Sequence, residues 1–332
     1  MKAAYIKRYG KIEDLQMDEQ PKPSITENDV LVKVHAASIN PLDLRVLEGE
    51  FKAILPVKFP FILGNDFAGV VVQIGSDVTQ FKIGDEVYAK TDLNGAFAEY
   101  TVVQQSSLAL KPQNISMELA ASLPLVSLTA WQALVEIAKV TAGQKVLVHA
   151  GSGGVGSIAI QLAKHLGATV ATTTSAKNVP WVKALGADII IDYKTTDFEQ
   201  EIKNYDVVLD TQGGKTLEKS LNVLKRGGRI ISISGPPDRA FAEAINANGL
   251  LKFIIPLLSW STRKKAKKRG ITYSFLFMQP NGQQLSQISN LVEAEKIKPV
   301  VDTEYDFSKI KEALEYVNTG RTKGKVVLKI AD

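Results

Sequence analysis

A glycine-rich stretch in the middle of the chain constrains the fold more than any other feature. Residues 145–166 read KVLVHAGSGGVGSIAIQLAKHL, where a β-branched run leads into Gly151, Gly153 and Gly156 and then into apolar residues at helical spacing. A strand, a G-x-G-x-x-G turn and a helix in this order are the setting of a dinucleotide-binding fold. We therefore predict that the turn receives a pyrophosphate at the helix N-terminus. The alternative is a tight strand-to-helix turn with no ligand.

The runs around this turn predict a doubly wound parallel sheet. Further β-branched runs lie at 169–174 (TVATTT), 188–192 (DIIID), 205–210 (YDVVLD) and 229–234 (RIISIS), with helical patterns between several of them. Continuous apolar strands separated by helices indicate parallel pairing with helices on both faces. The late apolar run at 271–278 (ITYSFLFM) is expected at an edge of the sheet.

The two ends of the chain predict a second, β-rich domain. Short runs such as VLVKVHAAS (30–38) and FAGVVVQIG (67–75) are punctuated by glycine and turn signals until a helical pattern starts at Ser116. The final run VVLKI (326–330) is too short to form a domain and is expected to complete the N-terminal unit. We expect the β-rich domain to comprise residues 1–120 and 299–332, and the parallel-sheet domain to comprise residues 121–298.

Composition excludes several kinds of site. The 332 residues include no cysteine, which removes disulfides, thiolate nucleophiles, iron–sulfur clusters and cysteine-ligated zinc. Three histidines, His35, His149 and His165, make an all-histidine metal site a poor prospect, so no metal is predicted. The 40 Lys and Arg against 35 Asp and Glu give a mild charge of +5, which does not indicate a dedicated nucleic-acid binder.

The sequence gives no sign of export or of a membrane partner. The N-terminus MKAAYIKRYG lacks an apolar stretch of signal-peptide length. The longest strongly apolar segment, 249–260, is interrupted by Lys252 and Pro256 and falls short of the ~20 residues that span a bilayer. We expect a cytoplasmic protein.

The end of the second predicted strand of the parallel sheet favours NADPH. No Asp or Glu occurs between Gly156 and Ala187, whereas an acid in this region would accept hydrogen bonds from the adenosine ribose of NADH. The chain carries Ser175 and Lys177 there, and a hydroxyl with an ammonium suits a 2′-phosphate. The alternative is that Lys177 only starts a solvated helix and that ribose selection is loose.

Together these motifs resemble those of a known superfamily. They occur in order along almost the whole chain: ASINPLDLRVLEG (37–49), GNDFAGVVVQIG (64–75), GDEVYA (84–89), GAFAEY (95–100), SLTAW (127–131), HAGSGGVG (149–156), LDTQGG (209–214) and GKVVL (324–328). The sequence resembles zinc-independent medium-chain dehydrogenases/reductases, above all the NADPH:quinone oxidoreductase group. The resemblance implies an α/β protein with a GroES-like β-barrel domain, a Rossmann domain and an active site in the cleft between them.

Departures from the zinc-dependent relatives shape the expected chemistry. Asn40 and Asn65 stand where those relatives carry a cysteine and a histidine, and an amide is a poor zinc ligand. A site without metal or thiol suits electron-poor acceptors such as quinones and α,β-unsaturated carbonyls, whose developing oxyanion needs a hydrogen-bond donor. The candidates are Asn40 as donor, with Asp43 and Arg45 orienting it. Alternatively, Asn40 stabilises the turn before Pro41, and Asp43 and Arg45 form a structural pair.

The resemblance also implies a set of cofactor contacts. Asn40 and Thr129 are expected near the nicotinamide. The pyrophosphate is expected on the glycine turn and the remaining contacts on later loops: Gly151, Gly153, Gly154, Val155, Gly156, Ser175, Lys177, Tyr193, Ser234, Gly235, Phe275, Leu276, Lys323 and Lys325. For Phe275, the alternative is ordinary packing in the hydrophobic core.

Two features leave the partners open. The run RKKAKKR (263–269) is either a solvated helix face or a contact for nucleic acid or an acidic surface. An exposed edge strand at 271–278 favours a homodimer joined across the parallel sheets. The functional hypotheses are an NADPH-dependent reductase of quinones or enones and, as the alternative, a non-catalytic NADPH-binding protein with a nucleic-acid or regulatory role. A metal-free reductase of simple ketones ranks last, because no residue polarises an unactivated carbonyl.

Overall fold

The computed structural model describes residues 1–92 and 95–331 and divides the chain into two compact units. The first comprises Met1–Leu128 with Pro280–Asp332, and the second Thr129–Gln279. The expected bounds, 120/121 and 298/299, differ from these. The difference at the second bound arises because α11 (Gly282–Glu293) packs on β8 (Leu108–Leu110) and belongs with the first unit.

The first unit is built on a seven-stranded sheet and a smaller three-stranded one. The large sheet runs β15-β16-β3-β5-β6-β8, with β7 also paired to β3. Its strands are β3 (Asp29–Ile39), β5 (Asp66–Ile74), β6 (Glu86–Lys90), β7 (Tyr100–Gln104), β8, β15 (Val301–Asp306) and β16 (Lys325–Lys329). The small sheet contains β1 (Lys2–Ile6), β2 (Gln16–Glu19) and β4 (Phe61–Ile62).

The C-terminal strand joins the N-terminal sheet, as the sequence predicts. β16 pairs antiparallel with β3, so that Val326 lies opposite Ile39. Burial drives this pairing, because the apolar side chains of β16 are fully buried. The helices of this unit are α1 (Pro41–Glu48), α2 (Met117–Ala121), α11, α12 (Ile310–Asn318) and the first half of α3 (Pro124–Trp131). Ser116 caps α2 by accepting a hydrogen bond from the Leu119 N–H at 3.4 Å.

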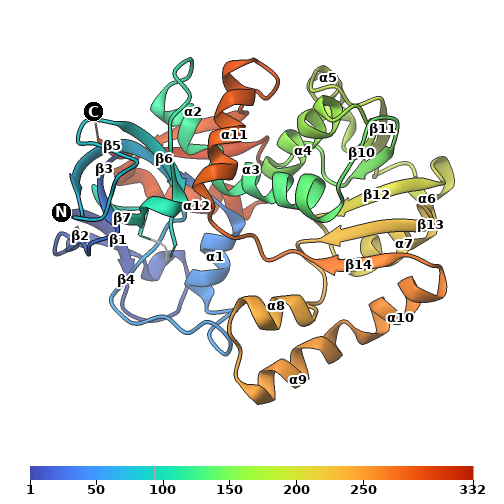
Figure 1. The fold of residues 1–332 in the computed structure, drawn as a ribbon, viewed down its shortest axis with the longest axis horizontal. Helices are drawn as coiled ribbons and strands as arrows, with labels where there is room; N and C mark the ends of the chain where they lie inside the picture. The colour runs from blue at the N-terminus through green and yellow to red at the C-terminus, as the bar shows by residue number, and fades with distance from the viewer. Residues whose placement is uncertain (93–94, 332) are drawn as a thin grey trace. The chain divides into compact units, whose positions relative to one another are not determined.

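The second unit is the predicted doubly wound sheet. Six strands, all parallel, lie in the order β11-β10-β9-β12-β13-β14. They are β9 (Lys145–Val148), β10 (Thr169–Thr174), β11 (Ile189–Asp192), β12 (Tyr205–Asp210), β13 (Leu224–Ser232) and β14 (Thr272–Phe275). The expectation that the run at 271–278 forms an edge strand is confirmed, because β14 is the last strand of the order (Figure 1).

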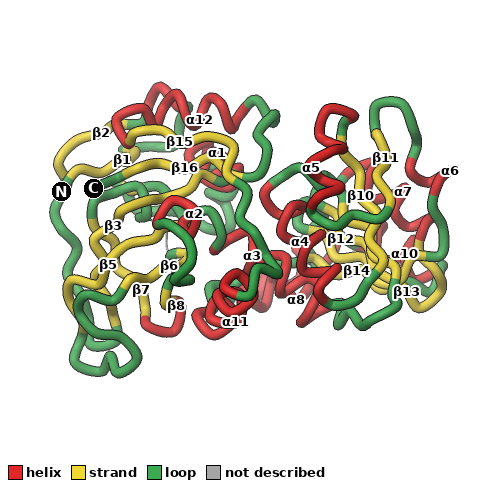
Figure 2. The backbone as a smooth tube through the Cα atoms, turned by 90° about the horizontal axis from the view of Figure 1, so that it is seen from above, coloured by secondary structure: helices red, strands yellow, loops and turns green. Residues whose placement is uncertain are grey.

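Helices cover both faces of this sheet, as Figure 2 shows. On one side α4 packs on β9 and β10 and α5 on β11, while on the other α7 packs on β12 and β13 and α10 on β14. The α-helices that lie wholly in the unit are α4 (Gly154–His165), α5 (Val179–Ala184), α6 (Phe198–Glu201), α7 (Gly214–Val223), α8 (Arg239–Ala244), α9 (Gly249–Leu258) and α10 (Trp260–Lys268). The second half of α3 also belongs to it and continues as a π-helix, Gln132–Ile137. Among residues 1–92 and 95–331, no helix combines the length and the apolar character that crossing a membrane requires.

Candidate functional site

The glycine-rich turn lies at the point where the strand order of the second unit reverses. β9 sits between β10 and β12, and the chain leaves β9 through the turn into α4. The neighbouring loop is tied to it, because the Thr211 hydroxyl after β12 donates to the His149 carbonyl oxygen at 3.1 Å. Ligands of open α/β sheets bind at the carboxyl ends of the strands at this reversal point. The topology therefore places the predicted motif at the expected ligand position.

The three glycines of the turn serve different purposes. A Cβ on Gly156 would lie 2.2 Å from the Ala150 carbonyl oxygen, and one on Gly151 would lie 2.2 Å from the Thr172 hydroxyl oxygen. Packing alone therefore requires both glycines. A Cβ on Gly153 would meet nothing closer than the same Ala150 oxygen at 3.4 Å, and Gly153 has an ordinary φ of −85°. Packing therefore leaves room for a side chain at Gly153, and a glycine at this position fits the close approach of a ligand.

Gly153 is also the N-cap residue of α4. Since it has no side chain, the N–H groups of the first turn, which includes Gly154, Val155 and Gly156, receive no cap from it. Free N–H groups and the positive end of the helix dipole form an anion site. These residues fit the pyrophosphate of a dinucleotide.

A buried histidine holds the base of this turn. The Ser220 hydroxyl donates to the Thr216 carbonyl oxygen at 2.7 Å, so it accepts from His149 Nε2 at 2.9 Å. His149 Nδ1 then accepts from the Thr173 hydroxyl at 3.1 Å, and Thr173 Oγ1 accepts the Ala150 N–H at 3.1 Å. Burial lowers the pKa of His149 to about 4, so the imidazole is neutral at pH 7. This histidine is therefore a positioning group for the turn, a role that the sequence analysis did not assign.

The end of β10 contains a buried hydroxyl that has no protein partner. Thr174 Oγ1 is the one buried side-chain polar atom without a hydrogen bond in the part of the chain that the structure describes. Ser175 is also buried, whereas Lys177 is exposed on the following turn. An unpaired buried hydroxyl is costly unless a ligand or water satisfies it. The residues at this strand end therefore fit a polar group such as a ribose or its phosphate.

An acidic residue near this strand end escaped the sequence analysis. β11 lies beside β10 with Asp192 opposite Thr174, and Asp192 Oδ2 accepts the Ala176 N–H at 3.2 Å. Its other oxygen accepts the Lys194 N–H at 3.0 Å. The sequence signal for this acid is the DIIID run (188–192), whose last residue lies on the strand beside β10. Backbone N–H groups engage both Asp192 oxygens.

The other residues expected to contact the cofactor in the second unit lie on later strand ends. Ser234 follows β13 and donates to the Thr211 carbonyl oxygen at 3.0 Å, close to the glycine turn's neighbouring loop. Gly235 is required by packing, since a Cβ there would lie 2.7 Å from the Ser232 and Tyr273 oxygens. The remaining predicted residues are more dispersed: Tyr193 is exposed after β11, Thr129 is buried in α3, Leu276 is buried after β14, and Phe275 packs edge-to-face on Phe241 at 5.4 Å.

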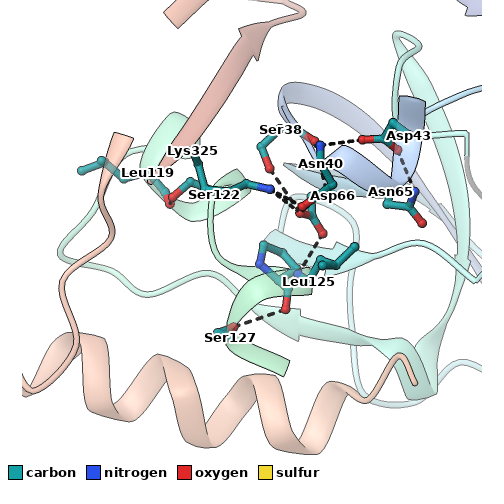
Figure 3. Close-up of polar contacts among 11 residues, drawn as sticks. Ser38, Asn40, Asp43, Asn65, Asp66, Leu119, Ser122, Leu125, Ser127 and Lys325 are labelled. Carbon is teal, nitrogen blue, oxygen red and sulfur yellow. Dashed lines mark hydrogen bonds and ion pairs between the residues drawn. The ribbon is translucent and has the colours of Figure 1, made fainter. Parts of the chain in front are cut away.

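The first unit holds a separate buried polar cluster, drawn in Figure 3. Asn40 directly follows β3 as the N-cap residue of α1, Asp66 begins β5 and Lys325 begins β16, so strand pairing brings the three side chains together. The Asn40 amide donates to Asp66 Oδ2 at 2.9 Å, and the Lys325 ammonium contacts both Asn40 Oδ1 and Asp66 Oδ2, the latter at 3.2 Å. Ser38 donates to the same carboxylate oxygen at 3.2 Å.

The second oxygen of Asp66 reaches the start of α3. Asp66 Oδ1 accepts the Leu125 N–H at 2.9 Å, so a carboxylate lies at a helix N-terminus, where negative charge is stabilised. Burial lowers the pKa of Lys325, while the charge of Asp66 acts in the opposite direction. The cluster is therefore a buried arrangement in which one cation, one carboxylate and one amide contact one another.

Asp43 belongs to this region and Arg45 does not. Asp43 accepts the Asn40 backbone N–H and the Asn65 amide, both at 2.7 Å, and burial raises its pKa to about 6. Arg45 points elsewhere and pairs with Glu50 at 3.7 Å on the exposed side of α1. The alternative of an Asp43–Arg45 pair is therefore wrong, because their positions two residues apart on a helix place them on different faces.

The two C-terminal lysines also differ. Lys325 is part of the buried cluster, whereas Lys323 is exposed and its backbone N–H donates to Asp302 at 3.0 Å. Sequence spacing of two in a strand-like segment predicts a common face, but the turn that ends at Gly324, with φ of +71°, separates them.

The positions that hold zinc in the zinc-dependent relatives do not fit a metal here. The Asn40 carbonyl oxygen faces the Lys325 ammonium, and the Asn65 amide donates to Asp43. A divalent cation beside Lys325 would meet an existing positive charge. Within residues 1–92 and 95–331, no group of three or more His, Cys, Asp or Glu side chains has the arrangement of a metal site.

Comparisons with known proteins agree on one family. A family model described as an alcohol dehydrogenase GroES-like domain matches residues 26–113, and one described as a zinc-binding dehydrogenase matches residues 185–328. The NADPH-dependent alkenal/one oxidoreductase of Arabidopsis thaliana chloroplasts is 37% identical over 99% of this chain and 79% of its own length.

Solved structures show the same likeness over the whole chain. The quinone oxidoreductase of Coxiella burnetii is similar with a TM-score of 0.86 and 34% identity, covering 100% of this chain and 99% of its own. The Escherichia coli quinone oxidoreductase, solved in complex with NADPH, has a TM-score of 0.84 and 26% identity, covering 99% of this chain and 100% of its own.

Proposed function

The chain belongs to the zinc-independent branch of the medium-chain dehydrogenase/reductase superfamily, and on that premise we propose that it transfers hydride from NADPH to quinones or α,β-unsaturated carbonyl compounds. It is an oxidoreductase with the expected GroES-like and Rossmann-type units. In the proposed reaction NADPH gives two electrons and one hydrogen as hydride, and the acceptor takes a proton from solvent to yield a hydroquinone or a saturated carbonyl. The relatives named above act on acceptors of these kinds by their names.

The observation that carries the NADPH assignment is the open glycine turn. Gly153 has room for a side chain yet lacks one, and it exposes the N-terminus of α4 at the strand-order reversal. Bound there, NADPH would supply the hydride, while the protein supplies orientation. Thr174, Ser175 and Lys177 would then bind the phosphorylated ribose.

Asn40 remains the proposed catalytic residue, and Asp43 is a positioning residue beside it. One Asn40 Nδ2 hydrogen is donated to Asp66 Oδ2, and the second, whose contact with the Ser38 carbonyl oxygen is long at 3.5 Å, is the donor proposed for the acceptor's developing oxyanion. Lys325 polarises the amide through Asn40 Oδ1. Asp43 positions Asn40 through its backbone N–H. Arg45, which the sequence analysis expected to orient Asn40, is not part of this proposal, since its observed partner is Glu50. Lys325 is a positioning residue in this proposal, because it acts through the amide.

The alternative of a non-catalytic NADPH-binding protein gains no support, since the relatives compared are oxidoreductases by name. A homodimer and a cytoplasmic location stay predictions. The Arabidopsis relative is described as chloroplastic, so it gives the cytoplasmic prediction no support.

The test is a screen of NADPH oxidation against quinones, enones and simple ketones, followed by the absorbance of the reduced nicotinamide. We expect turnover with quinones or enones, little with ketones, no effect of chelators and a strong preference over NADH. Turnover only with ketones, or only after zinc is added, would refute the proposal. A protein that binds NADPH tightly but oxidises it with none of the acceptors would favour the non-catalytic alternative.

A further inference from the structure

The segment after α8 forms a helical arm along the outside of the second unit. α9 and α10 follow one another with a single residue, Ser259, between them, and Figure 1 shows them beyond the edge strand β14. Three small or apolar residues at helical spacing, Ile255, Ser259 and Ala266, are buried against the unit. The arm therefore has one attached face and one face directed to solvent.

The solvent-directed face of α9 is strongly apolar. Leu250 and Phe253 are 70% and 71% exposed, and the same face continues through further large apolar side chains: Ile254, Leu257, Leu258 and Trp260. Single exposed apolar residues are ordinary on soluble proteins, but a contiguous row of five along α9, followed by Trp260 at the start of α10, is not. Such a patch marks an interaction surface.

The face of α10 that continues this patch is cationic. Residues 249–269 contain seven Lys and Arg and no Asp or Glu. One of them, Lys265, pairs with Glu218 at 2.6 Å, whereas Lys264, Lys267 and Lys268 have no carboxylate partner in the described part of the chain. Lys264 Nζ lies 4.5 Å from the Trp260 ring centroid, which joins the basic face to the apolar one.

We propose that α9 and α10 dock this protein on the surface of an anionic phospholipid bilayer. The apolar side chains of α9 enter the boundary between headgroups and acyl chains, Trp260 lies at the headgroup level, and the α10 lysines contact lipid phosphates. This inference departs from the expectation of no membrane partner, which considered only the length needed to span a bilayer. It does not depend on the proposed function.

The charge of the arm favours an anionic bilayer over two other binding partners, a second copy of the chain and a nucleic acid. A second copy of the chain docked face to face would bring two cationic α10 faces together with no acid in either arm, which opposes association. A nucleic acid would satisfy the lysines but would leave the six apolar side chains of the patch without a partner. An anionic bilayer satisfies both halves at once.

The experiment is sedimentation of the full chain with vesicles of phosphatidylcholine containing about one third phosphatidylglycerol. The apolar variant is Phe253→Ser with Leu257→Ser, and its matched control is Leu55→Ser with Ile83→Ser, two apolar residues exposed elsewhere. The charge variant is Lys264→Gln, Lys267→Gln and Lys268→Gln, with exposed Lys58→Gln, Lys82→Gln and Lys296→Gln as control. Circular dichroism confirms that each variant is folded.

We expect each test variant to have a vesicle–water partition coefficient lower by on the order of tenfold, and each control variant to have the wild-type coefficient. Pure phosphatidylcholine vesicles should bind weakly. Equal binding by the wild type and both test variants would overturn the proposal. Two other results would also overturn it, each in the absence of anionic-vesicle binding by the wild type. One is a dimer of the wild type, detected by light scattering, that the apolar variant loses. The other is binding of an RNA oligonucleotide that depends on Lys264, Lys267 and Lys268.

Discussion

Lys325 and Asp66 form a buried ion pair, with 3.2 Å between Nζ and Oδ2, from strands 259 positions apart in the chain. Both side chains are almost completely buried, and Asn40 contacts both of them. A buried pair need not stabilise a fold relative to an apolar pair, but removing one partner leaves a charge in the interior. The pair therefore links the C-terminal strand to the cluster that contains the proposed donor.

We predict that Lys325→Met lowers the free energy of unfolding by about 3–5 kcal/mol, because Asp66 loses its cation while it stays buried. The double variant Lys325→Met with Asp66→Asn should recover most of the loss, since no unpaired charge remains. Urea unfolding of the four proteins in the cycle measures the coupling. If the double variant were as unstable as the sum of the single ones, the pair would carry no coupling and this reading of the cluster would fail.

Two alanine substitutions in the glycine turn should have opposite consequences. Gly153→Ala should change the free energy of unfolding by no more than about 1 kcal/mol, since its Cβ has room, yet weaken NADPH binding by tenfold or more. Gly156→Ala should cost about 1–3 kcal/mol of stability, because its Cβ would meet the Ala150 oxygen at 2.2 Å. Thermal unfolding and quenching of protein fluorescence by NADPH check the pair. Unchanged NADPH affinity in Gly153→Ala would remove the main support for the pyrophosphate site.

His149 should make stability depend on pH between about 4 and 6.5. Burial lowers its folded pKa to about 4 from the ordinary 6.5 of a histidine, so in this window the unfolded chain binds the extra proton and stability rises with pH. The lowered pKa corresponds to about 3 kcal/mol of stability, fully present above pH 6.5 and lost as the pH falls toward 4. His149→Gln should be less stable at pH 7 but show a flatter profile. A profile as steep as that of the wild type would contradict the burial argument.

Lys177 should distinguish the two nicotinamide cofactors. Lys177→Glu should weaken NADPH binding by about tenfold to a hundredfold, because a carboxylate would repel the 2′-phosphate, and should leave NADH binding nearly unchanged. Lys183 lies outside the proposed site, so Lys183→Glu is the control for the change in net charge. Isothermal titration calorimetry with each cofactor gives the ratio of the NADPH and NADH affinities. An equal loss of affinity for NADPH and NADH would show that Lys177 does not bind the 2′-phosphate.

The sequence predicted what depends on local pattern. The glycine turn, the five β-branched runs, the apolar run at 271–278 and the return of VVLKI to the N-terminal sheet follow from spacing and burial, and the structure places each where it was expected. The buried cluster could only be predicted in part. Asn40 was found through the family resemblance, but its contact with Asp66 and Lys325 depends on pairing between strands far apart in sequence.

The misses have the same cause. Asp192 reaches the loop after β10 only because β11 lies beside it, and Arg45 turns away from Asp43 because of the helical repeat of α1. The length and hydropathy of the 249–260 segment indicate only that it does not span a bilayer, and they do not predict that one face of α9 is exposed. Its exposure came from the packing of Ile255 and Ser259, which no local pattern determines.

The central claim is metal-free hydride transfer from NADPH. The most direct measurement is a single-turnover reaction of chelator-treated protein with a quinone or enone, comparing NADPH with NADPH that carries deuterium at the transferred position. We expect complete oxidation of NADPH in the presence of chelator and a slower rate with deuterium. Loss of the reaction on chelation with recovery on adding zinc, or identical rates for the two forms of NADPH when chemistry is made rate-limiting, would contradict it.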